Sequence, residues 1–161
     1  MFTVEDYIQS IEINLMKQSN MLVGNLKEIL KKDFLEDVHL LDFTAFVEPT
    51  RFELSMMMFL MDVDGNEVFM EAGDTGFAGS VEVLPEVNFY MLEDKQLDAF
   101  FEFYEENEEV LVEKERHIFS AWFKSCWEKA GGREQERPSY FGLHDEYESL
   151  DLKNGDWVDD E

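Results

Sequence analysis

Residues 4–30 carry apolar side chains at the spacing of an amphipathic helix. Steps of three, four or seven positions separate Val4, Ile8, Ile11, Leu15, Leu22, Leu26 and Ile29. Thr3 and Asp6 have the spacing of a capping box, which predicts that the helix begins here. The stripe is interrupted at Ser19, and Asn20 and Gly24 favour a break or kink near the middle of this segment.

The period of the apolar pattern changes to two after Asp37, which indicates strands. Residues 41–47 alternate between apolar and more polar positions. Phe52–Met61 is apolar on both faces, as expected of an interior strand covered on both sides. Asp64-Gly65 is a hairpin-turn signal, so the next strand is expected at Val68–Met70. Residues 81–83 and 87–91 predict two further strands on either side of Pro85.

The C-terminal part returns to helical spacing before it ends in short strands. Residues 97–130 form one long helix or two, with the joint expected between Asn107 and Val112. Short strands are expected at Phe141–Leu143 and Tyr147–Leu152. Asn154-Gly155 then predicts a terminal hairpin that leads into Trp157-Val158.

This order of elements predicts an α+β fold. Because hairpin turns, and not helices, join the predicted strands, we expect an antiparallel sheet of about five or more strands. The sheet is expected to pack against the N-terminal helix and the C-terminal helical pair, and the chain ends in a short hairpin. The length of 161 residues matches one domain of about 100–150 residues, so residues 1–161 are expected to form a single domain.

The charge of the chain is its outlying feature. It has 38 acidic and 13 basic residues, a formal net charge of −25, together with 45% apolar residues and 15 Phe. Enough apolar residues are present for a folded core, so the excess acid is expected on the surface. Such a surface repels nucleic acid and anionic lipid and attracts cationic proteins.

The sequence predicts a cytoplasmic protein without a membrane segment. Acidic residues follow the initial Met1 where a signal peptide needs a basic region and an apolar run. No apolar run approaches the ~18–20 residues of a membrane span. Cys126 is the only cysteine, so no intrachain disulfide is expected.

Two short motifs resemble catalytic or metal sites, but turn chemistry accounts for both. Asp74-Thr75-Gly76 resembles the tripeptide that carries the catalytic aspartate of aspartic proteases, which implies two carboxylates sharing one proton. The flanking residues do not follow that family's pattern, and an ordinary glycine turn is predicted. Asp62–Asn66 begins like a calcium loop, but position six is Glu67 and position twelve is Gly73, so a hairpin is predicted.

The remaining candidates for chemistry are isolated residues. His39, His117 and His144 lack zinc-site spacing, Glu113 and His117 suit a surface hydrogen bond, and Cys126 is expected to pack as a small apolar residue. Four methionines, Met56 to Met58 and Met61, are expected in the core. We expect no catalytic site, cofactor or metal.

Carboxylates gather in two parts of the sequence. A stripe of Glu102, Glu106, Glu109 and Glu113, with Glu105 and Glu108 beside it, follows steps of four and three along the predicted helix. Like charges at this spacing cost helix stability, so the stripe is either a solvated face or a partner site. A second cluster contains Asp145, Glu146, Glu148, Asp151 and residues 156–161.

These features favour a non-enzymatic acidic inhibitor that masks a cationic surface of a protein partner. In general character the chain resembles bacterial immunity proteins, which implies a nuclease toxin as the partner and no direct binding to nucleic acid. The expected contacts are the carboxylates Glu102, Glu105, Glu106, Glu109, Glu113, Asp145 and Glu146, with Tyr147 and Trp157 as aromatic anchors. One alternative is a DNA mimic; another is an enzyme whose site is assembled from Asp74, His144 and Asp145.

Overall fold

A computed structural model describes residues 1–159 of the chain. The helical elements in chain order are α1 (Val4–Met16), α2 (Ser19–Leu30), the 3-10 turn η1 (Asp94–Gln96), α3 (Leu97–Glu106), α4 (Glu108–Lys129) and the 3-10 turn η2 (Gly132–Glu134). The strands are β1 (Leu40–Glu48), β2 (Glu53–Met61), β3 (Val81–Asn88), β4 (Ser139–Leu143), β5 (Glu148–Asp151) and β6 (Trp157–Asp159). The last two residues of the C-terminal acidic cluster, 160 and 161, lie outside the described residues.

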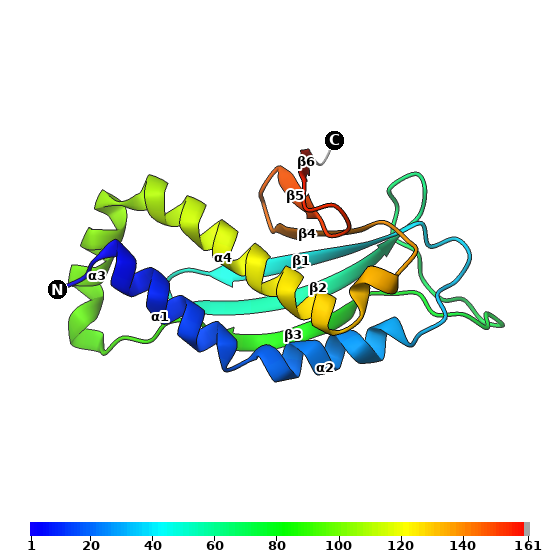
Figure 1. Cartoon of the computed structure of the whole chain (residues 1–161), viewed down its shortest axis with the longest axis horizontal. Coiled ribbons are helices and arrows are strands. Elements are labelled where there is room, and N and C mark those ends of the chain that lie inside the picture. The colour runs from blue at the N-terminus through cyan, green and yellow to red at the C-terminus, as the bar shows by residue number, and fades with distance from the viewer. Residues whose placement is uncertain (160–161) are drawn as a thin grey trace.

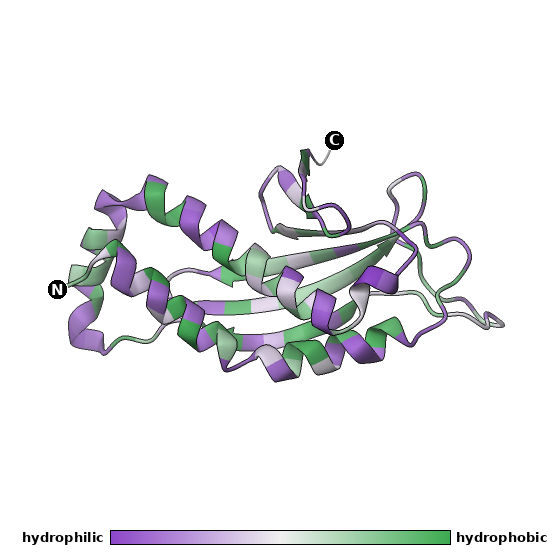
Figure 2. Cartoon of the chain, in the orientation of Figure 1, coloured by the Kyte–Doolittle hydropathy of each residue, from purple (hydrophilic) through white to green (hydrophobic). Residues whose placement is uncertain are grey.

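The strands form one six-stranded sheet in the order β3-β2-β1-β4-β5-β6. Helices α1, α2 and α4 lie across one face of this sheet, and α3 lies beyond its end, next to the start of α1 (Figure 1). Hydrophobic and hydrophilic bands alternate along each helix (Figure 2), as expected of helices with one face on a core. The predicted α+β fold is therefore confirmed.

The pairing of β1 with β4 is parallel, whereas the other four strand pairs are antiparallel. The expectation of a wholly antiparallel sheet was wrong at this one pair. After β3 the chain passes through α3 and α4 and returns beside β1 in the same direction. This is the helical crossover that a parallel pair requires.

Strand β2 is an interior strand, as expected, but only one of its faces is packed against the helices. Leu54, Met56, Met58 and Leu60 are buried and alternate with half-buried residues such as Met57 and Met61. The expectation of burial on both faces was wrong, because all the helices that contact the sheet lie on one side of it. Of the four methionines, Met56 and Met58 belong to the core.

The strands expected at Val68–Met70 and on either side of Pro85 differ in the structure. Residues 68–70 form no strand. After the turn at Asp64-Gly65 the chain pairs with β2 only at the bridge Met61–Glu67, and β3 is the strand that pairs with β2 along this edge. Pro85 lies inside a single strand, β3, at the edge of the sheet. An edge strand tolerates proline because no partner requires its missing N–H on the open side, and the β2–β3 register shifts near Met56.

The two predicted helical regions are each divided in two. The N-terminal break falls at Lys17-Gln18, just before the predicted interruption at Ser19, and Gly24 lies inside α2. The second break falls at Asn107, within the predicted joint, where φ is −119° and ψ is 16°. The Asn107 side-chain amide donates to the Phe103 carbonyl oxygen over 2.9 Å. The terminal hairpin is confirmed as β5 and β6.

Aromatic rings fill the core between α4 and the sheet. The Phe43 ring centroid lies 4.9 Å from that of Phe123 and 5.2 Å from that of Trp127, and Phe123 stacks on Phe141 at 4.6 Å. Ala45, the next inward residue of β1 after Phe43, is also buried but carries only a methyl group.

Candidate functional site

The joint between α3 and α4 forms a hollow of about 680 Å³ lined by carboxylates. We call this surface the acidic elbow; its lining residues are Glu105, Glu106, Asn107, Glu108, Glu109, Val110, Val112 and Glu113. The break at Asn107 divides the predicted stripe between two helices and so changes which carboxylates meet. Glu108, which comes directly after the break, joins the hollow, whereas Glu102 is exposed on α3 outside it.

Glu113 is the carboxylate of the acidic elbow that is paired with neighbouring side chains. Glu113 accepts hydrogen bonds from Arg116, the nearer at 2.9 Å, and lies 2.9 Å from Nε2 of His117. The Arg116 bond, with the His117 bond second, holds the pKa of Glu113 below its usual value. Within residues 1–159, no ion pair involves the other four carboxylates, Glu105, Glu106, Glu108 and Glu109.

Two valines are exposed among these unpaired carboxylates. Val110 is 49% exposed and Val112 is 39% exposed. Apolar residues at the centre of a charged rim are the usual anatomy of a protein contact surface, where the centre supplies affinity and the rim supplies specificity. The acidic elbow can therefore contact a partner through both charge and apolar area.

The turn between β4 and β5 lies next to the acidic elbow and carries the second group of predicted contacts. A hollow of about 310 Å³ between α4 and the ends of β1 and β4 is lined by Val112, Asp145 and Glu146, among others. Since Val112 lines both hollows, Asp145 and Glu146 of the second acidic group lie next to the acidic elbow. Tyr147 stands at the edge of this turn and is 85% exposed.

Trp157 occupies a different environment from Tyr147. The Arg116 guanidinium lies 4.7 Å from the Trp157 ring centroid, and the His117 ring meets it edge-on. Arg116 also pairs with Glu148 over 2.8 Å. These contacts fasten the terminal hairpin to α4, and they leave Trp157 half-buried, so its role as an aromatic anchor stays a prediction.

A half-buried carboxylate beneath this surface was not singled out from the sequence. Glu115 of α4 accepts hydrogen bonds from the hydroxyls of Tyr7 over 2.5 Å and Tyr104 over 2.7 Å. Burial raises the pKa of Glu115 above its usual value, although the two tyrosine hydrogen bonds act in the opposite direction. Its position in the sequence carries a signal, because Glu115 falls on the same helical face as the apolar residues Leu111 and Ile118.

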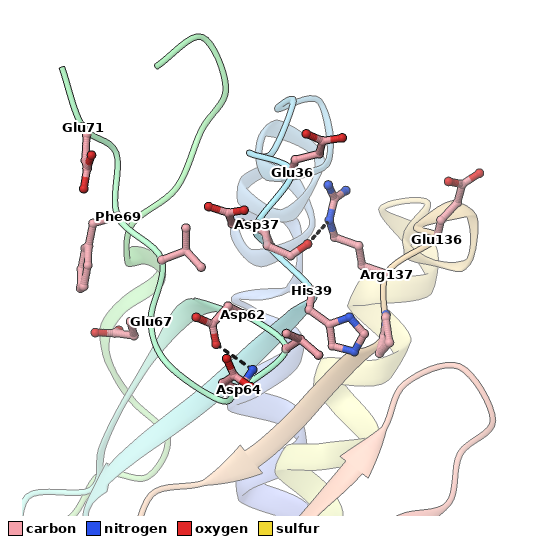
Figure 3. A pocket seen from close by; sticks show the side chains of 14 residues that line it. Glu36, Asp37, His39, Asp62, Asp64, Glu67, Phe69, Glu71, Glu136 and Arg137 are labelled. Atoms are coloured by element: carbon pink, nitrogen blue, oxygen red, sulfur yellow. Dashed lines mark hydrogen bonds between the residues drawn. The ribbon is translucent and has the colours of Figure 1, made fainter. Parts of the chain in front are cut away.

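A second acidic hollow, of about 1000 Å³, is lined partly by loops at the opposite end of the sheet from the α3–α4 joint (Figure 1), and Figure 3 shows its lining side chains. We call it the acidic basin; its charged lining residues are Glu36, Asp37, His39, Asp62, Asp64, Glu67, Glu71, Glu136 and Arg137. Arg137 Nε donates to the Val38 carbonyl oxygen over 2.9 Å, and Asp62 accepts the backbone N–H groups of Asp64 and Asn66. In the described part of the chain, no group of three or more His, Cys, Asp or Glu side chains is placed to hold a metal ion.

The residues considered for catalysis are not brought together. Asp74 lies in the loop after β2, where its carboxylate accepts the Glu71 N–H over 2.6 Å as part of the predicted turn. His144 and Asp145 lie at the far end of β1, where the His144 N–H donates to the Ala45 carbonyl oxygen. His144 Nε2 lies 3.4 Å from Asp145 Oδ1, but a site containing all three residues is not formed. Cys126 is buried, as expected.

Comparison with known proteins adds no family. No protein-family model, curated protein or solved structure matches the chain. Among residues 1–159, no helix has the length and apolar character needed to cross a bilayer.

Proposed function

We propose that this chain is a non-enzymatic acidic binding protein that masks a cationic surface of a protein partner, with the acidic elbow as its principal contact. The observation that carries the proposal is one hollow that is lined both by the exposed Val110 and Val112 and by four carboxylates without an ion pair in residues 1–159, namely Glu105, Glu106, Glu108 and Glu109. A folded chain that leaves so many carboxylates unpaired in one hollow accepts mutual repulsion there. A cationic partner removes that repulsion.

Inhibition is the form of this activity that we propose. A nuclease binds phosphate through a cationic groove, and an acidic surface that covers the groove competes with nucleic acid. Long-range attraction between the two surfaces raises the association rate, up to about 10⁸–10⁹ M⁻¹s⁻¹ at low salt. An immunity protein against a toxin nuclease is therefore the specific case that we propose to test first.

The exposed valines favour this kind of contact over DNA mimicry. A DNA mimic also binds a protein, but it does so through carboxylates at phosphate-like positions. Val110 and Val112 instead supply apolar area, which suits a partner surface that has apolar groups of its own. Tyr147, with its exposed ring, suits the same purpose at the adjacent turn.

The test is affinity capture from the source cell with three forms of the tagged chain. The first is wild type, and the second carries Glu→Gln at positions 105, 106, 108 and 109. The third carries Glu→Gln at positions 36, 67, 71 and 136 of the acidic basin, which gives the same change in charge at the other end of the molecule. A basic protein that wild type and the basin variant retain, that the elbow variant loses and that salt elutes supports the proposal. Equal loss from both variants, or capture of nothing basic, contradicts it.

A further inference from the structure

The hollow beneath the N-terminal half of α4 has the shape and chemistry of a pocket for one long cationic side chain. It encloses about 310 Å³, at the small end of the ~300–1000 Å³ range of ligand sites. It lies between Val112, Glu115 and Phe119 of α4 and Ala45 and Val47 of β1. We call this hollow the Glu115 pocket.

The walls of the Glu115 pocket are apolar, and its charge is mostly negative. Val47, Val112, Phe119 and Leu143 contribute apolar surface, while Glu115, Asp145 and Glu146 contribute carboxylates and His144 one imidazole. Arginine and lysine combine an apolar stem with a charged head, and therefore suit walls of this kind with carboxylates among them. An anionic ligand is repelled by the same carboxylates.

The Glu115 carboxylate is held in place and has unused capacity to accept hydrogen bonds. Tyr7 donates to Oε2 and Tyr104 donates to Oε1, so the orientation of the carboxylate is fixed. An ionised carboxylate has about four lone-pair sites, and two of them remain. Burial raises the pKa of Glu115 above its usual value despite these two hydrogen bonds. A cation in the pocket compensates the charge that burial leaves poorly solvated.

We propose that the Glu115 pocket receives an arginine side chain of the protein partner. Arginine fits better than lysine because its planar fork can donate two parallel hydrogen bonds to a carboxylate and can stack on aromatic rings. The exposed imidazole of His144, whose ring centroid lies 4.8 Å from that of Phe46, is the aromatic group at the pocket that such stacking can use. This inference rests on the proposed function, and it names the group of the partner that anchors next to the acidic elbow.

The pocket is tested without the partner, by titrating the whole chain with N-acetyl-arginine amide and following backbone amide signals by NMR. N-acetyl-citrulline amide is the matched probe, since it replaces the guanidinium by a neutral urea of similar shape. We expect saturable shifts at Phe119 and Leu143 with the arginine probe, and affinity at least about tenfold weaker with the citrulline probe. Equal binding of both probes, or no saturable binding of the arginine probe, overturns the proposal.

Three variants assign the binding to this pocket. Glu115→Gln removes the charge and is expected to weaken the affinity for the arginine probe by about tenfold or more. Val47→Phe fills the hollow without a change of charge and should weaken the affinity for both probes. This variant still tests the pocket if Glu115→Gln fails to fold. Glu82→Gln, exposed on β3 outside both hollows, is the control and should bind as wild type does. Arginine binding that survives both pocket variants overturns the proposal.

The two proposals fail in different ways. If the arginine probe does not bind but a basic protein is captured through the acidic elbow, the Glu115 pocket proposal is wrong and the proposed function stands. If the probe binds in the pocket but no basic protein depends on the elbow, the proposed function is wrong, and only the cation-binding chemistry of the pocket remains.

Discussion

The hydroxyl of Tyr7 on α1 donates a 2.5 Å hydrogen bond to Oε2 of Glu115 on α4, 108 positions away in the sequence. The bond joins the two helices beside a cluster of aromatic rings, in which the Tyr7 ring centroid lies 4.7 Å from that of Tyr90 and 5.2 Å from that of Phe100. Tyr104 of α3 donates to the other oxygen of the same carboxylate over 2.7 Å. Three helices, α1, α3 and α4, are therefore joined by hydrogen bonds to one carboxylate, that of Glu115.

The pH dependence of stability should reveal this buried charge. The folded pKa of Glu115 is raised, mainly by burial, whereas an unfolded glutamate titrates near ~4.3. Its contribution to stability is therefore fully present below about pH 4.3 and is lost as pH rises through the folded pKa. We expect the melting temperature of Glu115→Gln, relative to wild type, to increase between pH 4 and pH 8. A relative melting temperature that falls over this range contradicts the assigned direction.

Neutralising the acidic elbow should change association and stability in opposite directions. With Glu→Gln at 105, 106, 108 and 109, the association rate with the captured partner should fall by about tenfold or more at low salt. The difference should shrink as salt screens the attraction over a Debye length of ~8 Å at physiological ionic strength. The free energy of unfolding should stay constant or rise by a few tenths of a kcal/mol for each relieved pair.

Stopped-flow association at several salt concentrations and thermal melts check both halves of that prediction. The basin variant, with the same charge change at 36, 67, 71 and 136, is the control. If the elbow variant associates at the wild-type rate with the same salt slope, the elbow is only a solvated face.

Substituting alanine at two glycines should change the free energy of unfolding in opposite directions. A Cβ at Gly132 would lie 2.2 Å from the Trp127 ring, so Gly132→Ala should destabilise the protein by roughly 1–3 kcal/mol as the core repacks. Gly24 lies inside α2 with nothing within 4 Å of the added atom, and Gly24→Ala should stabilise by about 0.5–1 kcal/mol. Urea unfolding of both variants measures the two free energies, and equal signs would contradict the packing around Trp127.

The thiol of Cys126 should react slowly in the native protein. Cys126 is 1% exposed and burial raises the pKa of its thiol, while thiol reagents attack the thiolate. We expect 5,5′-dithiobis(2-nitrobenzoate) to modify the native chain far more slowly than the chain in concentrated urea. Comparable rates in the two conditions would show that the helix α4 face around Cys126 opens readily.

The sequence alone determined most of the elements, because their signals are local. A helix start such as Thr3 with Asp6 depends on one hydrogen bond within a turn, and the Thr3 side chain does accept from the Asp6 N–H. The terminal hairpin follows from Asn154-Gly155, and the joint near Asn107 from a polar interruption of the apolar stripe. The two-layer α+β class follows from the order of these elements.

Only the tertiary structure decided how distant elements meet. The parallel pairing of β1 with β4 depends on where the chain returns to the sheet after α3 and α4. The one-sided burial of β2 depends on the packing of all the helices against the same face of the sheet. The same holds for the functional surface. No local pattern indicates that Val112 borders the β4–β5 turn, that Trp157 is covered by Arg116, or that Tyr7 reaches Glu115. These contacts join residues far apart in sequence, and their energies come from packing and burial that exist only in the folded chain.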